Sequence, residues 1–217
     1  MAGVITALSV QKRDRERVNI YLDGEFAFAL PAVEAARLRK GQELSDAQIT
    51  QLKAIDVEAK VYDRAVRFLG YRPRSNAEVR RHLREHEVAE VVADRIIERL
   101  QQAGYVDDRA FARFWIESRQ QFRPRGERAL RDELRQKGVA ADIVEELLEQ
   151  GEIDEETTAY RLVCAKARQW SRLDRRAFWQ KGGGFLARRG YAYGIIEPTL
   201  RRLWEELHAD EALAEGQ

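Results

Sequence analysis

Residues 71–74 read Tyr-Arg-Pro-Arg, and residues 122–125 repeat this motif as Phe-Arg-Pro-Arg. A second motif recurs as well, because Gly-Tyr-Val-Asp at residues 104–107 returns as Gly-Glu-Ile-Asp at residues 151–154. A third, more divergent copy is visible in Leu-Ala-Arg-Arg-Gly-Tyr at residues 186–191. Self-similarity at a fixed period is typical of repeat architectures. The sequence therefore predicts three tandem units, each about fifty residues long.

Each unit is expected to contain three helices. In repeat 2, the second of these repeats, Asp107 is a predicted N-cap, and apolar residues follow it at i, i+3 and i+4 spacing. The Arg-Pro-Arg motif ends this helix, because proline disfavours helical backbone at the residue before it. A middle helix then spans about residues 126–136, with Gly138 as its left-handed C-terminal residue. A third helix covers about residues 141–150.

The first thirty residues follow a different pattern. Apolar residues alternate with other side chains around Asp23-Gly24, which predicts a hairpin, and an earlier run at residues 4–10 completes a three-stranded meander. Pro31 suits the start of a short helix, and Ser45 is a predicted N-cap for a helix that extends toward residue 69.

We therefore expect a mainly α fold. Tandem three-helix-bundle repeats, similar to helix-turn-helix domains, form an elongated curved arrangement behind a small N-terminal antiparallel β-meander. The predicted domains are residues 1–50 (β-meander and short helix), 51–106 (repeat 1), 107–152 (repeat 2) and 153–217 (repeat 3).

Composition excludes several classes of protein. The chain has 217 residues, is 35% charged and contains 4 Pro, which suits a helical protein and not a disordered one. Its one cysteine, Cys164, excludes an intramolecular disulfide framework and a multi-cysteine zinc site. The sequence lacks a secretory signal pattern and any stretch of ~18 apolar residues, so we expect a cytoplasmic protein.

The net charge of +1 conceals a separation of charge along the chain. Residues 72–84 hold five arginines and one acid, residues 119–137 hold seven basic residues and three acids, and residues 161–189 hold nine basic residues and one acid. Acids gather elsewhere, with eight acids and no base at residues 142–156 and five acids and no base at residues 205–215. The turns and middle helices are thus basic, and the third helices and the C-terminal tail are acidic.

This separation argues against helix-turn-helix DNA readout, which would place an acidic third helix in the major groove. A basic strip for an extended polyanion, or for a repetitive acidic surface, fits the pattern better. The alternative, that each arginine pairs with an acid on a solvated helix face, stays open. Tyr191 and Tyr193, beside two arginines, are the candidates for base stacking, whereas the tryptophans are expected to pack in the cores. The candidates for binding a partner or DNA are Arg72, Arg74, Arg80, Arg84, Arg123, Arg125, Arg131, Arg135, Arg175, Arg176, Lys181, Arg188, Arg189 and Tyr191.

Other motifs favour structural roles. His82 and His86 have zinc-like spacing but no third ligand nearby in the sequence, so we interpret them as a surface pair. Cys164 lies in an apolar stretch and is expected to be a buried thiol. The three glycines at residues 182–184 predict a flexible or kinked position in the middle helix of repeat 3. No nucleophile–base pair or carboxylate cluster emerges, so we predict neither an enzyme nor a cofactor.

The sequence resembles the RecX family, bacterial regulatory proteins that restrain the RecA recombinase. The resemblance covers nearly the whole chain, and its most specific parts are residues 68–75, 104–108 and 186–191, with residues 17–25 similar to a β-containing extension. It implies a monomer that binds in the groove of the RecA–single-stranded DNA filament and hinders its growth, ATP hydrolysis and strand exchange. It also implies weaker, accessory binding to single- and double-stranded DNA, and a part in recombination, DNA repair and the SOS response. The competing hypothesis is an architectural or regulatory DNA-binding protein that acts without RecA.

Overall fold

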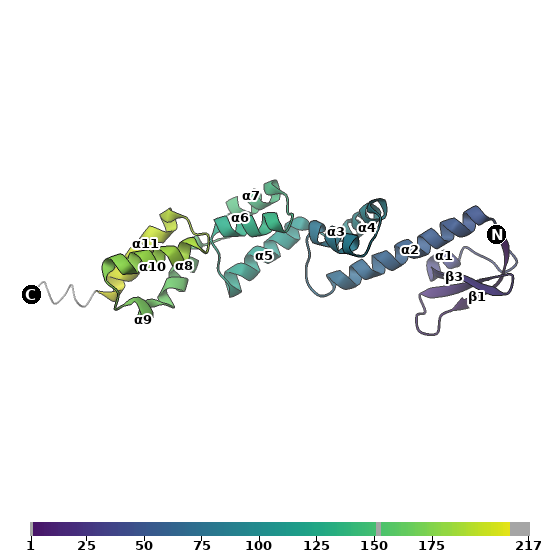
Figure 1. Cartoon of the computed structure of the whole chain (residues 1–217), viewed down its shortest axis with the longest axis horizontal. Helices are drawn as coiled ribbons and strands as arrows, with labels where there is room; N and C mark the ends of the chain where they lie inside the picture. Colours follow the sequence, from purple (N-terminus) through teal and green to yellow (C-terminus); the bar gives the residue numbers. More distant parts are fainter. Residues whose placement is uncertain (1, 151–152, 209–217) are drawn as a thin grey trace, which may run out of the picture. The chain divides into compact units, whose positions relative to one another are not determined.

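A computed structural model describes residues 2–150 and 153–208. Within these residues the protein has four strands and eleven helices, which confirms the predicted mainly helical fold with an N-terminal sheet (Figure 1). The chain divides into two compact units. The first unit comprises residues 1–72 and 79–105, and the second comprises residues 73–78 and 106–217.

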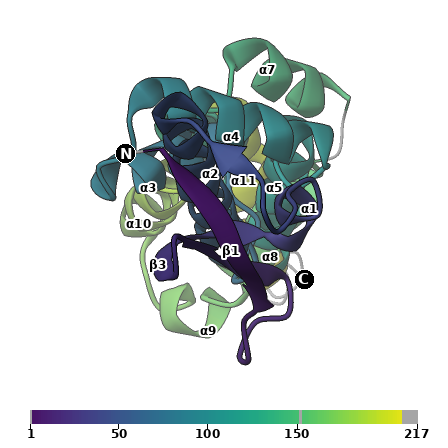
Figure 2. The same cartoon turned by 90° about the vertical axis from the view of Figure 1, so that its right-hand side faces the viewer.

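The N-terminal sheet is an antiparallel meander of β1 (Gly3–Val10), β2 (Arg17–Leu22) and β3 (Glu25–Pro31) (Figure 2). Asp23 and Gly24 both have positive φ, 49° and 93°, as the predicted tight hairpin turn requires. The sequence did not predict the short β4 strand, Glu43–Leu44, which pairs with β1 and gives the order β3-β2-β1-β4. Two residues are too few to show an alternating pattern.

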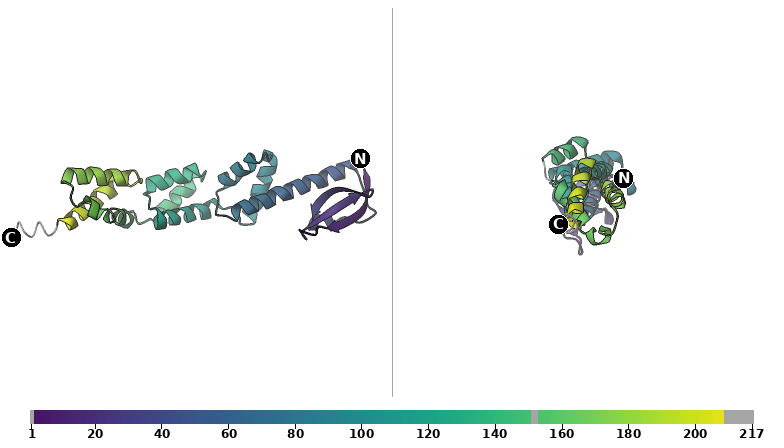
Figure 3. Two further views of the ribbon diagram at one scale, coloured as in Figure 1. Left: turned by 60° about the horizontal axis from the view of Figure 1, so that its bottom comes forward. Right: turned by 90° about the vertical axis from the view of Figure 1, so that its left-hand side faces the viewer.

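Helix α2 (Asp46–Leu69) packs against β3 and continues unbroken into repeat 1 (Figure 3). Ser45 forms the predicted N-cap as a full capping box with Gln48. The predicted domain boundary after residue 50 therefore falls inside a helix. An ion pair between Arg17 on β2 and Asp56 on α2 joins the sheet to the helix. The buried core under the sheet comprises Ile5, Val18, Ile20, Phe28, Leu30, Ala35 on α1 (Ala32–Ala35), Leu44 and Ile49.

The three-helix scheme holds in repeats 1 and 2. Repeat 1 combines the second half of α2 with α3 (Asn76–Glu85) and α4 (Glu90–Gln102). Repeat 2 consists of α5 (Asp108–Phe122), α6 (Glu127–Gln136) and α7 (Ala141–Glu149). Asp107 accepts hydrogen bonds from two backbone N–H groups of α5, and Gly138 has φ +76°, so both predicted helix ends are confirmed. The core of repeat 2 comprises Phe111, Ala112, Ile116, Leu134, Val139, Val144, Leu147 and Leu148.

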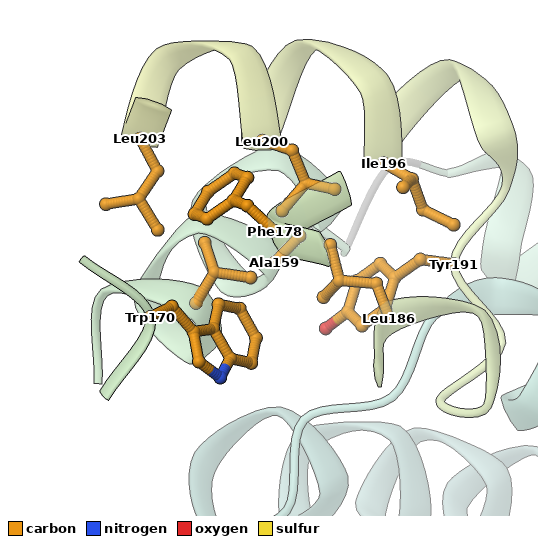
Figure 4. Close-up of a cluster of buried hydrophobic side chains, with 9 residues drawn as sticks. Ala159, Trp170, Phe178, Leu186, Tyr191, Ile196, Leu200 and Leu203 are labelled. Atoms are coloured by element: carbon orange, nitrogen blue, oxygen red, sulfur yellow. The ribbon is translucent and has the colours of Figure 1, made fainter. Parts of the chain in front are cut away.

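Repeat 3 contains one more short helix than predicted. Its helices are α8 (Glu155–Cys164), α9 (Ala167–Trp170), α10 (Arg175–Ala187) and α11 (Tyr193–Leu207). Its core holds Ala159, Val163, Trp170, Phe178, Leu186, Tyr191, Ile196, Leu200 and Leu203 (Figure 4). Trp179 and Trp204 pack against this core and Trp115 against that of repeat 2, which confirms the packing role predicted for the tryptophans.

The glycines at residues 182–184 lie inside α10, which runs unbroken through them. Gly182 is buried, and a Cβ there would lie 2.6 Å from the Leu200 side chain. The glycine therefore allows α11 to approach α10 closely, a tertiary role that propensity does not reveal. Among the described helices, none is long and apolar enough to cross a membrane.

Candidate nucleic-acid interface

The Arg-Pro-Arg turn of repeat 2 borders a basic pocket. The pocket has a volume of about 340 Å³ and lies entirely within the second unit. Its lining comes from the end of α5, the turn, α8 and the end of α10, and comprises Phe122, Arg123, Pro124, Arg125, Leu162 and Arg189. Three of the predicted binding residues, far apart in sequence, therefore come together in one place. We call this site the Phe122 pocket.

Backbone contact between repeats 2 and 3 positions Arg189 at the pocket. The N–H of Gly126 donates a hydrogen bond to the carbonyl oxygen of Arg189 at 2.9 Å. A Cβ on Gly126 would lie 2.5 Å from the carbonyl oxygen of Gly190, and a Cβ on Gly190 would lie 2.4 Å from the backbone nitrogen of Ala129. Gly190 also has φ +87°, which side chains disfavour. Glycine is thus required on both sides of this contact.

The Phe122 pocket carries positive charge that is only partly compensated. Burial lowers the pKa of Arg189, and the nearby charge of Arg125 lowers it further. The Arg189 guanidinium lies over the Phe185 ring at 3.8 Å and donates to the Phe185 carbonyl oxygen. Arg125 is 3.6 Å from Glu133, which Arg119 also binds at 2.6 Å. No carboxylate of the described residues forms an ion pair with Arg189 or Arg123, so an anion entering the pocket gains their attraction.

At the junction between repeats 1 and 2 the corresponding carbonyl oxygen, that of Lys137, accepts a hydrogen bond from the Ser75 hydroxyl at 2.5 Å, and the cation there is neutralised. The residue before the left-handed glycine is Lys137 there, and its ammonium binds Glu78 at 2.9 Å. Glu78 is the third residue of α3, and the third residue of α6 is Ala129, which has no charge. The corresponding cation at the next junction, Arg189, therefore has no such partner. Among the residues that the structure describes, the cation before the left-handed glycine is thus paired with a carboxylate at the first junction and not at the second.

A half-buried carboxylate lies at each junction. Asp108 accepts a hydrogen bond from the backbone N–H of Asn76, and Glu155 accepts one from that of Glu127, both at 2.8 Å. Burial raises the pKa of both carboxyl groups. These half-buried acids at the start of α5 and α8 thus connect consecutive repeats.

The middle-helix arginines of repeats 1 and 2 are used within their own repeats. Arg80 binds Glu90 at 2.5 Å and Asp94 at 2.6 Å, and the equivalent Arg131 binds Glu145 at 2.7 Å. This ion pair joins the middle helix to the third helix and accounts for the recurrence of the arginine. The pairing interpretation is therefore correct at these two positions, and it removes them from the candidate surface.

The acidic third helix of repeat 2 is partly neutralised in the same way. Glu146 receives two hydrogen bonds from Arg109, and this arginine lowers the pKa of the Glu146 carboxyl. Arg131 has the same effect on the pKa of Glu145. Asp142 and Glu149 remain exposed.

The remaining candidates differ in exposure. Arg84 and Arg135 are exposed and lie at 4.0 Å from Glu90 and 3.3 Å from Asp132, whereas Arg72 and Arg74 are half-buried. The cations on and beside α10 are exposed and form no ion pair with any residue that the structure describes; they are Arg175, Arg176, Lys181 and Arg188. Repeat 3 therefore presents a second group of available charges, which we call the α10 cations.

Tyr191 was wrongly predicted as a stacking residue. Its side chain is only 2% exposed and lies in the core of repeat 3 (Figure 4). Its hydroxyl is 3.2 Å from the Thr158 hydroxyl, and burial raises the pKa of the phenol. The corresponding residue of repeat 2, Val139, is also buried, so the repeat alignment already indicated a core position.

The exposed rings that sequence reasoning missed stand directly before the Arg-Pro-Arg motifs. Tyr71 is 85% exposed and Phe122 is 73% exposed. Two features of the sequence could have indicated their exposure. The rings occupy the same position in two repeats, and other residues already fill the apolar faces of the helices.

The histidine pair and Cys164 contact neighbouring side chains of the fold. His82 and His86 contact each other, and His82 stacks on Phe68 at 3.9 Å. Among the described residues, no three His, Cys, Asp or Glu side chains form a group that could hold a metal ion. Cys164 is half-buried, not fully buried as predicted, and its thiol contacts the Tyr160 hydroxyl.

Comparison with known proteins matches four segments to one family. Residues 3–45 match the regulatory protein RecX N-terminal domain. Residues 62–100, 107–148 and 154–200 match the first, second and third three-helix domains of RecX.

Whole-chain relatives agree with these matches. A regulatory protein RecX from Lactobacillus delbrueckii subsp. bulgaricus is 34% identical over 98% of this chain and 79% of its own length. The RecX of Bacillus velezensis is 32% identical, covering 98% of this chain and 81% of that protein. A crystal structure of regulatory protein RecX superposes with a TM-score of 0.77 at 29% identity, covering 90% of this chain and 97% of that one.

The fold and the site thus define a protein of tandem three-helix domains with an available basic surface. The four domain matches and the whole-length relatives specify it further. The chain belongs to the RecX family of regulatory proteins.

Proposed function

We propose that the protein binds the RecA–single-stranded DNA filament and restrains its ATPase and strand-exchange activities, and so modulates recombination and DNA repair. It would act in the cytoplasm as a monomer without catalysis of its own. Membership of a regulatory family supports a protein partner. One structural observation carries the DNA side of the proposal. The cations of the Phe122 pocket and of α10 lack ion pairs with described acids, apart from the 3.6 Å contact of Arg125, whereas Arg80 and Arg131 are fully engaged.

These available cations suit a polyanion that is coated with protein, as the DNA of a nucleoprotein filament is. Neutralising phosphates with Lys or Arg releases counterions and provides affinity without sequence preference. The exposed carboxylates Asp142 and Glu149 would contribute contacts to basic side chains of the protein coat. A partner that presents both signs therefore fits the near-zero net charge of the chain better than naked duplex DNA.

The test is the RecA ATPase on single-stranded DNA, measured with sub-stoichiometric amounts of this protein. The wild-type protein should inhibit. A variant with Arg175→Glu, Arg176→Glu, Lys181→Glu and Arg188→Glu should not, although its exposed substitutions leave the cores intact. A control with Arg39→Glu and Lys40→Glu, two exposed cations in the N-terminal region, should inhibit like the wild type.

Absence of inhibition by the wild-type protein would overturn the proposal. If the protein then still bound DNA tightly, with a steep dependence on salt, the alternative of a DNA-binding protein that acts without RecA would stand. If the variant with the four charge reversals inhibited as strongly as the wild type, the α10 cations would be excluded from the interface.

A further inference from the structure

We propose that the Phe122 pocket is a binding site for one nucleotide of single-stranded DNA, in which the Phe122 ring stacks on the base and the arginines hold the adjacent phosphate. This inference deepens the proposed function, on which it rests for the source of the strand. It assigns a separate task to a residue that contributes nothing to the repeat core.

The exposure of Phe122 is the first observation. Phe122 is the last residue of α5, and its ring is 73% exposed, while Phe111 and Ile116 on the same helix fill the core. The ring therefore contributes little to folding. An exposed aromatic face beside a basic groove is the arrangement with which proteins bind unpaired bases, since every base has a π-face.

The lining of the pocket is the second observation. Phe122 and Leu162 provide apolar surface, and Arg123, Arg125 and Arg189 provide positive charge within the same 340 Å³. A nucleotide offers the complementary pair of groups, a flat apolar base and an anionic phosphate. Duplex DNA keeps its bases stacked on one another, so it would use the arginines and leave the ring without a partner.

Repetition is the third observation. Tyr71 stands at the same position before Arg-Pro-Arg in repeat 1 and is 85% exposed. A polymer ligand presents the same chemistry at successive positions, so tandem repeats that each offer an exposed ring match a strand better than a single small molecule. A core function would instead have buried both rings.

Rigidity is the fourth observation. The hydrogen bond from Gly126 to the Arg189 carbonyl and the close approach of Gly190 fix the two walls of the pocket to each other. Binding therefore needs little ordering of the walls, which favours affinity.

The experiment measures binding to fluorescent oligonucleotides without RecA. Three ligands are compared: oligo-dT, an abasic strand of equal length that keeps the phosphates, and a duplex. Phe122→Leu should weaken oligo-dT binding by about 5- to 150-fold, the range for removing one stacked base. It should leave the affinities for the abasic strand and the duplex unchanged. Phe122→Trp should restore oligo-dT binding, because a larger ring preserves stacking.

Two controls separate stacking from charge and from folding. Arg123→Gln should weaken all three ligands alike, because each offers phosphates. Val33→Leu alters a side chain that is 73% exposed in the N-terminal region, and it should change nothing.

Unchanged oligo-dT binding by Phe122→Leu would overturn the proposal. This holds even if the variant no longer inhibits RecA, because the Phe122 ring would then contact protein and not a base. An equal loss on the abasic strand would also overturn it. If the proposed function fails, the result is different: the variants bind the three oligonucleotides as expected above, but the wild-type protein does not inhibit the RecA ATPase.

Discussion

Gly190→Ala should break the contact that holds repeats 2 and 3 together. Alanine at φ +87° costs about 1–2 kcal/mol in backbone strain. Its Cβ would also lie 2.4 Å from the backbone nitrogen and 2.9 Å from the Cα of Ala129, atoms that move only with α6. Overpacking of this kind adds about 1–3 kcal/mol. We therefore expect a total loss of about 2–5 kcal/mol in the free energy of unfolding of the second unit.

Gly104→Ala is the matched control. Gly104 has a similar φ of +74°, but nothing lies within 4 Å of the added Cβ. Its loss should be limited to the strain of about 1–2 kcal/mol. It should also occur in the first unit, because Gly104 belongs there.

Urea denaturation distinguishes the two variants. All four tryptophans, Trp115, Trp170, Trp179 and Trp204, lie in the second unit, so their fluorescence reports that unit alone, whereas circular dichroism reports both. Gly190→Ala should lower the fluorescence midpoint by about 1–2 M urea. Gly104→Ala should leave the fluorescence midpoint unchanged and shift only circular dichroism. Equal fluorescence shifts for the two variants would refute the reasoning from close approach.

Three further predictions follow from described contacts. Arg123→Gln should reduce the slope of log K against log salt by about 1 in DNA binding, whereas Arg131→Gln should not, because Glu145 holds its guanidinium; equal slopes would contradict this. Gly183→Ala should stabilise α10 by about 1 kcal/mol in thermal unfolding, because its Cβ would lie 4.0 Å from Ile196, an ordinary contact. Gly182→Ala should destabilise the protein, because its Cβ would lie 2.6 Å from Leu200; two losses would contradict the assignment. Burial raises the pKa of Asp108, so its contribution to stability is complete below the unfolded pKa and is lost as the pH rises through the folded pKa. Asp108→Asn keeps the accepting oxygen and should therefore be at least as stable as the wild type at pH 7, an advantage that shrinks in acid; lower stability at pH 7 would contradict it.

Features that local chemistry decides could be predicted from the sequence. Asp23-Gly24 can adopt a turn with two positive φ values, and Ser45 followed by Gln48 forms a capping box irrespective of the rest of the fold. Recurrence of Arg-Pro-Arg, together with the divergent copy at residues 186–191, was sufficient to count the repeats. These signals lie within a few residues of the structure that they determine.

The candidate site could be predicted only in part, because its electrostatics depend on distant residues. Arg80 and Arg125 both lie in basic segments, yet the first binds Asp94 of the next helix, whereas the second is 3.6 Å from Glu133 and is close to the charge of Arg189. Tyr191 follows two arginines and was assigned to the surface, although the left-handed Gly190 turns it into the core. Short-range charge counts cannot distinguish these cases.

The contact at Gly126 and Gly190 has a consequence for how this surface can change over evolutionary time. Main-chain atoms of Gly126, Arg189 and Gly190 and the side chain of Glu155 hold the two walls together, and the side chains of Phe122 and Arg123 take no part in these contacts. Arg123 and Phe122 can therefore be exchanged for other side chains while the geometry of the repeats is retained. Selection can tune which ligand the pocket accepts without a loss of folding, and a protein engineer can do the same.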